Sequence, residues 1–158
     1  MTARWYLGGA VVAAAVGWLA ARIHLSGWTP LGLLSLAVGI GLGFSISKLA
    51  TATGICCRKR LVVGALLFAA IAVFAEHAWL YRDFRRQWNE ARASEPQVAM
   101  FRREEPWSPT EYLRHEIAAG RVALWCMDAA LIATGTLGTV LVGRSASTDR
   151  VVVADDAN

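Results

Sequence analysis

Residues 69–92 read AAIAVFAEHAWLYRDFRRQWNEAR, and this stretch decides how the rest of the chain is arranged. The residues before Glu76 are apolar, as in a helix that crosses hydrocarbon. Those after Tyr81 mix arginines with aromatic side chains, as at a membrane surface. The stretch therefore predicts a transmembrane helix that takes in two ionisable residues, Glu76 and His77, and continues without a break as an amphipathic helix.

Composition indicates the same class of protein. The chain has 158 residues, of which 56% are apolar and 18% charged, and its mean hydropathy is +0.41. These values are typical of a polytopic membrane protein rather than an ordinary soluble domain. The net charge of +4 does not indicate nucleic acid, because the basic residues lie at the ends of apolar runs. Cys56, Cys57 and Cys126 form no zinc motif and no even disulfide set, so we expect free thiols.

Four apolar runs are candidates for crossing a bilayer, and they cover residues 5–25, 31–49, 61–81 and 122–142. The predicted fold class is therefore all-α: a polytopic integral membrane protein with a four-transmembrane-helix bundle in residues 1–143. An amphipathic interfacial segment, 82–121, separates the third and fourth spans, and a disordered polar tail covers 144–158. The first run could also be a cleaved signal peptide, but its length and its tryptophans at both ends favour a retained anchor.

Small residues recur at every fourth position in the first two spans. These residues are Gly9, Ala13, Gly17 and Ala21 in the first span, and Ser35, Gly39, Gly43 and Ser47 in the second. Such stripes let helix backbones approach closely where lipid gives no hydrophobic reason for association. They are interpreted either as a dimerisation surface or as packing of the first span on the second within one chain. We favour the packing within one chain.

The connections between spans carry recognisable helix start signals. Pro30 suits the first turn of the second span. Ser108 is a good N-cap, Pro109 fits the first helical position, and Glu111 completes a capping box with Ser108. We therefore expect the last helix to begin before the membrane and to continue into the fourth span.

Charge next to the spans bears on location and orientation. We expect the cell membrane, either plasma or bacterial inner membrane. Basic residues divide almost evenly between its two sides. The compact cluster of Arg58, Lys59 and Arg60 favours the cytoplasm, which would place both termini there as well.

Glu76, His77 and Asp128 are predicted to form one polar cluster near one face of the membrane, with Arg22 as the counter-charge. The purely apolar part of the third span is about 22 Å long, so a complete crossing draws Glu76 and His77 below the interface. Asp128 follows the start of the fourth span by a similar distance and should lie at the same depth. The alternatives are that the cluster handles protons or a ligand, or that it only holds the helices together.

The segment after Tyr81 is predicted to lie at the lipid headgroups. The residues expected to contact headgroups are Arg82, Arg85, Arg86, Arg92 and Trp88. Tyr81, Phe84 and Trp88 share one helical face, as in an interfacial helix. The alternative is a solvated helix that merely extends the third span.

No complete catalytic, metal or nucleotide motif is present. His24, His77 and His115 do not form a recognisable pair of haem ligands, and we expect neither cofactor nor metal. The predicted function is a non-enzymatic membrane protein that assembles with itself or with another membrane protein. The alternative is a proton- or ion-linked carrier that uses the buried acids of the third and fourth spans. A phospholipid-modifying enzyme ranks third.

Overall fold

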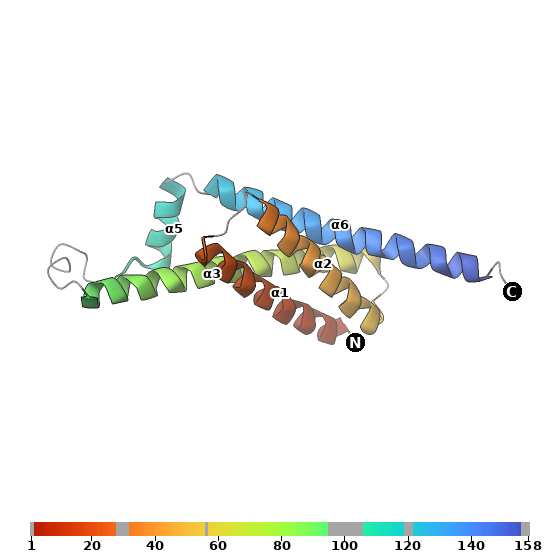
Figure 1. The fold of residues 1–158 in the computed structure, drawn as a ribbon. Coiled ribbons are helices and arrows are strands. Elements are labelled where there is room, and N and C mark those ends of the chain that lie inside the picture. Colours follow the sequence, from red (N-terminus) through yellow and green to blue (C-terminus); the bar gives the residue numbers. More distant parts are fainter. Residues whose placement is uncertain (1, 28–31, 56, 95–105, 119–121, 156–158) are drawn as a thin grey trace.

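The computed structural model describes residues 2–27, 32–55, 57–94, 106–118 and 122–155, which form five α-helices and no strand (Figure 1). The helices are α1 (Thr2–Leu25), α2 (Leu33–Ala52), α3 (Arg58–Ser94), α5 (Pro109–Ala118) and α6 (Val122–Asp155). Four of them are long and apolar enough to cross a membrane, over Ala3–Leu25, Leu33–Ala52, Arg58–Ser94 and Ala123–Val142. The prediction of an all-helical chain with four long apolar helices is confirmed, and α5 is an additional short helix.

The four long helices alternate in direction. α1 and α3 run toward the end of the molecule where α5 lies, and α2 and α6 run away from it (Figure 1). α5 crosses steeply between the far end of α3 and the start of α6. We call this end of the bundle the α5 end, and the three pockets described below lie there.

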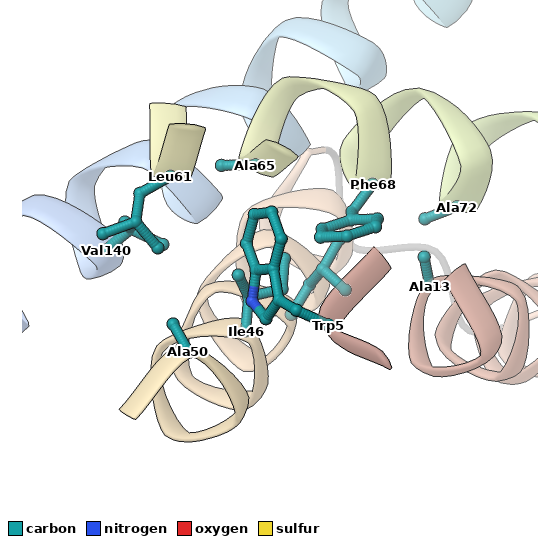
Figure 2. Close-up of a cluster of buried hydrophobic side chains, with 10 residues drawn as sticks. Trp5, Ala13, Ile46, Ala50, Leu61, Ala65, Phe68, Ala72 and Val140 are labelled. Carbon is teal, nitrogen blue, oxygen red and sulfur yellow. The ribbon is translucent and has the colours of Figure 1, made fainter. Parts of the chain in front are cut away.

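The centre of the bundle is an aromatic contact between α1 and α3. The rings of Trp5 and Phe68 meet edge to face with their centroids 5.2 Å apart, and both side chains are fully buried. Figure 2 shows them within a cluster drawn from α1, α2, α3 and α6. Gly64 makes room for the Trp5 indole, because a Cβ at that position would overlap the ring. Trp5 therefore belongs to the core.

Packing of the first span on the second through the two small-residue stripes would require the stripes to face each other. They do not. The stripe of α1 packs against α3, where a Cβ on Gly17 would overlap the carbonyl oxygen of Ala72. The stripe of α2 packs against α6, where a Cβ on Gly39 would overlap the carbonyl oxygen of Ile132. Each stripe therefore packs against a later helix, α3 or α6, and not against the other stripe.

α3 is a single helix of 37 residues. The prediction that the third span continues without a break into the charged segment is confirmed. α2 begins at Leu33 and has Gly32 as its N-cap. Pro30, which we expected in the first turn of this helix, lies outside the described residues.

The helices near the C-terminus differ from expectation in two ways. The capping box at the start of α5 is confirmed: the Ser108 N–H donates to Glu111 Oε2 at 2.9 Å, and the Glu111 N–H donates to Ser108 Oγ at 3.3 Å. This helix ends at Ala118 and is separate from α6. α6 itself continues to Asp155, beyond residue 144, where we expected disorder. An existing helix is cheap to extend, and residues 144–155 contain neither proline nor glycine.

Candidate functional site

A pocket of about 560 Å³ at the α5 end gathers several ionisable side chains from different helices. It lies between the end of α1 and the helices α3, α5 and α6. Its ionisable lining residues are three histidines and four acids: His24, His77, His115, Glu76, Asp83, Glu116 and Asp128. No lysine or arginine is among the described residues that line it. We call it the acidic pocket.

Three of the four residues predicted to cluster meet in the acidic pocket, namely Glu76, His77 and Asp128. Arg22 does not. Its place near Glu76 is taken by His24, whose Nδ1 lies 3.8 Å from Glu76 Oε1. Residues two apart in a helix point about 200° from each other, so only one of Arg22 and His24 can face this pocket. The prediction used depth alone and did not take account of the direction in which the α1 side chains point.

Asp128 is anchored from α2. The hydroxyl of Ser35 donates a hydrogen bond of 2.6 Å to Asp128 Oδ1. Deeper along the same pair of helices, Thr136 Oγ1 lies 3.1 Å from the carbonyl oxygen of Gly39. These contacts fix the carboxylate of Asp128 relative to the backbone of α2. Ser35 was predicted only as part of a packing stripe, so its role as a hydrogen-bond donor is new.

His77 lies on the boundary between the acidic pocket and a second cavity. Its imidazole packs against the indole of Trp125 with ring centroids 4.3 Å apart. Both ring nitrogens are buried, and neither forms a hydrogen bond among the described residues. A buried imidazole without partners is costly, since a polar group removed from water needs a compensating hydrogen bond.

The second cavity is an apolar groove of about 710 Å³ between α3, α5 and α6. Its lining is almost entirely aliphatic and aromatic: Leu66, Ala69, Ala70, Val73, Phe74, His77, Ala78, Tyr81, Pro109, Tyr112, Leu113, Trp125, Ala129 and Ala133. His77, Tyr112 and Trp125 line both this groove and the acidic pocket. A ligand with an apolar body and a polar head could therefore occupy the two together.

An aromatic cluster holds α5 over these cavities. The Tyr81 hydroxyl donates to the carbonyl oxygen of Trp107 at 2.8 Å, and the Phe84 ring stacks on that of Trp107 with centroids 5.7 Å apart. Tyr112 packs on both Tyr81 and Phe84. We expected Tyr81, Phe84 and Trp88 to face the membrane. Instead Tyr81 and Phe84 contact α5 and the residues just before it, because the chain folds back onto α3.

A third pocket, of about 440 Å³, lies on the opposite side of α3 and is basic. It is lined from α1 by Trp18, Ala21, Arg22 and Leu25, and from α3 by Trp79, Arg82, Asp83, Arg85, Arg86 and Asn89. Three of the predicted headgroup residues, Arg82, Arg85 and Arg86, are therefore gathered here. Arg92 and Trp88 do not line it. We call it the arginine pocket.

Several ionisable residues that line the acidic pocket were not predicted, namely His24, Asp83, His115 and Glu116. Glu116 is only 6% exposed. Tyr112, His115 and Glu116 are spaced by three and four residues, which places them on one face of a helix. This spacing could have indicated that α5 turns a polar face inward, but not which partner it meets.

The remaining reactive groups form no further site. Among the described residues, no three of the His, Cys, Asp and Glu side chains lie close enough to hold a metal ion. Cys57 and Cys126 are free, exposed thiols, as predicted, and Cys56 lies outside the described residues. The pKa of the Cys57 thiol is lowered, chiefly by a hydrogen bond from the backbone of Arg60 at the start of α3.

Comparison of the chain with protein-family models, with curated proteins and with solved structures finds no match. The geometry of the pockets is therefore the basis for a functional proposal.

Proposed function

We propose that this chain is an integral membrane protein with four spans, and that it binds hydrophobic organic cations in exchange for protons. The cation head would occupy the acidic pocket and the apolar body would lie in the groove beside it. The observation that carries the proposal is the position of His77, Tyr112 and Trp125 on the boundary between an acidic pocket and an apolar groove. This is the carrier that ranked second on the sequence.

The outer surface of the bundle supports the membrane placement. Large apolar side chains are highly exposed on several helices: Leu7 69%, Val11 70%, Phe74 78% and Val142 70%. Water disfavours an apolar surface of this extent, whereas hydrocarbon accepts it. Four crossings would place both termini on one side, and the basic cluster Arg58–Arg60 favours the cytoplasm for that side.

Charge selects the kind of ligand. Four carboxyl groups line the acidic pocket, and no lysine or arginine is among the described residues that line it. Phosphates and carboxylates are repelled by such a lining, whereas a cation is attracted. The aromatic faces of Trp125 and Tyr112 add to this preference, because a cation over an aromatic ring is stabilised by the ring electrons. The groove, with hardly any polar surface, selects an apolar body.

Protons are the natural competitors of such a cation. A carboxyl group that binds a proton loses the charge that attracts the ligand, so the affinity for a cation falls as the pH falls. By linkage, binding of the cation must release protons. Glu76 on α3 and Asp128 on α6 are each adjacent in sequence to a residue that lines the groove, His77 and Ala129 respectively, so we assign the exchange to them.

Assembly with itself or with another membrane protein, which ranked first on the sequence, rested on the small-residue stripes and on the arginine-rich segment after Tyr81. In the described structure Gly17 and Gly39 contact α3 and α6 of the same chain. These faces are therefore occupied within one molecule, and they no longer favour a second copy as partner.

Titration of the purified full chain in mild detergent with tetraphenylphosphonium tests the proposal by calorimetry. We expect saturable binding that weakens as the pH is lowered from about 8 to about 6. Asp128→Asn and Glu76→Gln should each weaken binding about tenfold at the higher pH, the effect of losing one charge interaction. Glu90→Gln is the matched control, because Glu90 is an exposed carboxyl of α3 that pairs with Arg86 outside the acidic pocket.

A neutral analogue of the same shape, tetraphenylmethane made soluble by the detergent, separates the contribution of charge to binding from that of hydrophobicity. It should bind much more weakly than the cation. Equal binding of the two, or unchanged affinity in both carboxyl variants, would contradict the proposal.

A further inference from the structure

The arginine pocket has a geometry of its own that the proposed function does not use. Arg82, Arg85 and Arg86 are spaced by three and four residues and so share one face of α3. This face points toward α1, which contributes Arg22 to the same pocket. Close approach of the two helices at Gly17, against the backbone of Ala72, brings these groups together.

The four guanidinium groups are poorly compensated. Among the described residues that line the pocket, Asp83 is the single acid, and its Oδ2 already accepts a hydrogen bond of 2.7 Å from Gln87. Arg86 forms an ion pair with Glu90 at 3.1 Å, but both side chains are more than 60% exposed, and such pairs contribute little. Arg22, Arg82 and Arg85 form no ion pair within the described parts of the chain. Four like charges held together in this way favour an anion between them.

Two tryptophans frame the pocket. The guanidinium of Arg82 lies over the indole of Trp79, with its carbon 4.7 Å from the ring centroid. Trp18 contributes the second indole from α1. Trp79 and Trp18 are 37% and 44% exposed, as expected for side chains at the level of lipid headgroups. Leu25 of α1, which lines this pocket, and Leu19 of the same helix are exposed apolar side chains.

We propose that the arginine pocket binds the phosphate of an anionic glycerophospholipid. Guanidinium groups bind phosphate oxygens through paired N–H donors, and the amide of Asn89 adds a further donor. The acyl chains would lie along the exposed apolar surfaces of α1 and α3. A zwitterionic lipid would bring its own cation next to four arginines, which selects against it. This inference rests on the membrane placement proposed above, but not on cation binding.

Native mass spectrometry tests this site on the full chain, released from nanodiscs of equal parts phosphatidylglycerol and phosphatidylcholine. We expect phosphatidylglycerol to be retained preferentially. The double variant Arg82→Gln/Arg85→Gln should lower this preference about tenfold. Arg58→Gln/Arg60→Gln is the matched control, because it removes the same charge at the opposite end of α3 and should leave the preference unchanged.

The single variant Arg22→Gln keeps the test informative if the double variant misfolds. Arg22 is exposed near the end of α1, so its replacement should reduce the lipid preference without loss of thermal stability. Glycerol phosphate, added at millimolar concentration, distinguishes a lipid from a free phosphate. The proposal predicts that it fails to displace the bound lipid. Complete displacement, or equal effects of the double variant and the control, would overturn the proposal.

The proposals of cation binding and of lipid binding can be refuted independently. Tetraphenylphosphonium should bind the double arginine variant as it binds the unmodified chain. Retained lipid preference with no cation binding would remove the proposed function alone, whereas retained cation binding with no lipid preference would remove the lipid site alone.

Discussion

The two sides of α3 between residues 76 and 89 carry opposite charge. One side contributes Glu76, His77, Leu80, Asp83, Phe84 and Gln87 to the acidic pocket, and the other contributes Trp79, Arg82, Asp83, Arg85, Arg86 and Asn89 to the arginine pocket. Among the described residues of α3, only Asp83 lines both pockets. Successive helical residues turn by about 100°, so a sequence that mixes acids and arginines along its length separates them in space. A charged stretch therefore need not be one uniform surface.

The two pockets also differ in what covers them. Within the described parts of the chain, the arginine pocket is lined by α1 and α3, whereas the acidic pocket is lined by α1, α3, α5 and α6. The aromatic cluster that holds α5 lies on the acidic side. Changes in helix packing should therefore affect the two pockets to different degrees.

The largest loss of stability is expected at Gly39, where α2 packs against the backbone of α6 beside the acidic pocket. Gly39→Val forces α2 away from the carbonyl oxygen of Ile132 on α6 and disturbs the hydrogen bond between Ser35 and Asp128. We expect a loss of about 1–3 kcal/mol of stability, typical of overpacking, and a clear drop in the thermal unfolding midpoint in detergent. Cation binding should weaken, whereas lipid preference should persist.

Gly41→Val is the control for this substitution. Gly41 lies on the same helix, and a Cβ there meets nothing within 4 Å. Gly41→Val carries the same intrinsic cost of placing valine in a helix as Gly39→Val, but it lacks the overlap with α6. Equal unfolding midpoints for the two variants would show that α2 and α6 are not in contact at Gly39.

A smaller effect is expected from Tyr81→Phe, which removes the hydrogen bond to the carbonyl oxygen of Trp107 and leaves the ring in place. A hydrogen bond of this kind contributes about 1 kcal/mol. Amide hydrogen exchange in α5 should therefore become about fivefold faster, since opening of this helix becomes easier. Tyr6→Phe on α1 is the control, because its hydroxyl has no hydrogen-bond partner among the described residues. Unchanged exchange in α5 would mean that the aromatic cluster does not hold it.

The helices themselves could be predicted from the sequence. Apolar runs of about 20 residues and the capping box at Ser108 and Glu111 act locally, so their positions follow from residue order. The pairing of the helices could not be predicted in this way. Both glycine stripes are compatible with any close partner, and the choice of α3 for α1 and of α6 for α2 depends on how all the helices fit together.

The residues of the acidic pocket could be predicted where their depth along the spans decides whether they meet. Glu76, His77 and Asp128 share a level in the bundle, and counting residues from the span ends was sufficient to group them. Arg22 was misplaced because its direction around α1, not its depth, decides which pocket it joins. His115 and Glu116 could not be assigned, since a helix that folds back over α3 is set by aromatic contacts between Phe84, Trp107 and Tyr112.

The central claim is that a hydrophobic cation and protons compete for Glu76 and Asp128 in the acidic pocket. The most direct test is proton release, followed with a pH indicator when tetraphenylphosphonium is added to the full chain in weakly buffered detergent. We predict release within the range of about pH 5 to pH 8, and none in Glu76→Gln/Asp128→Asn. Cation binding without any proton release throughout this range, or equal release from that double variant, would contradict the account.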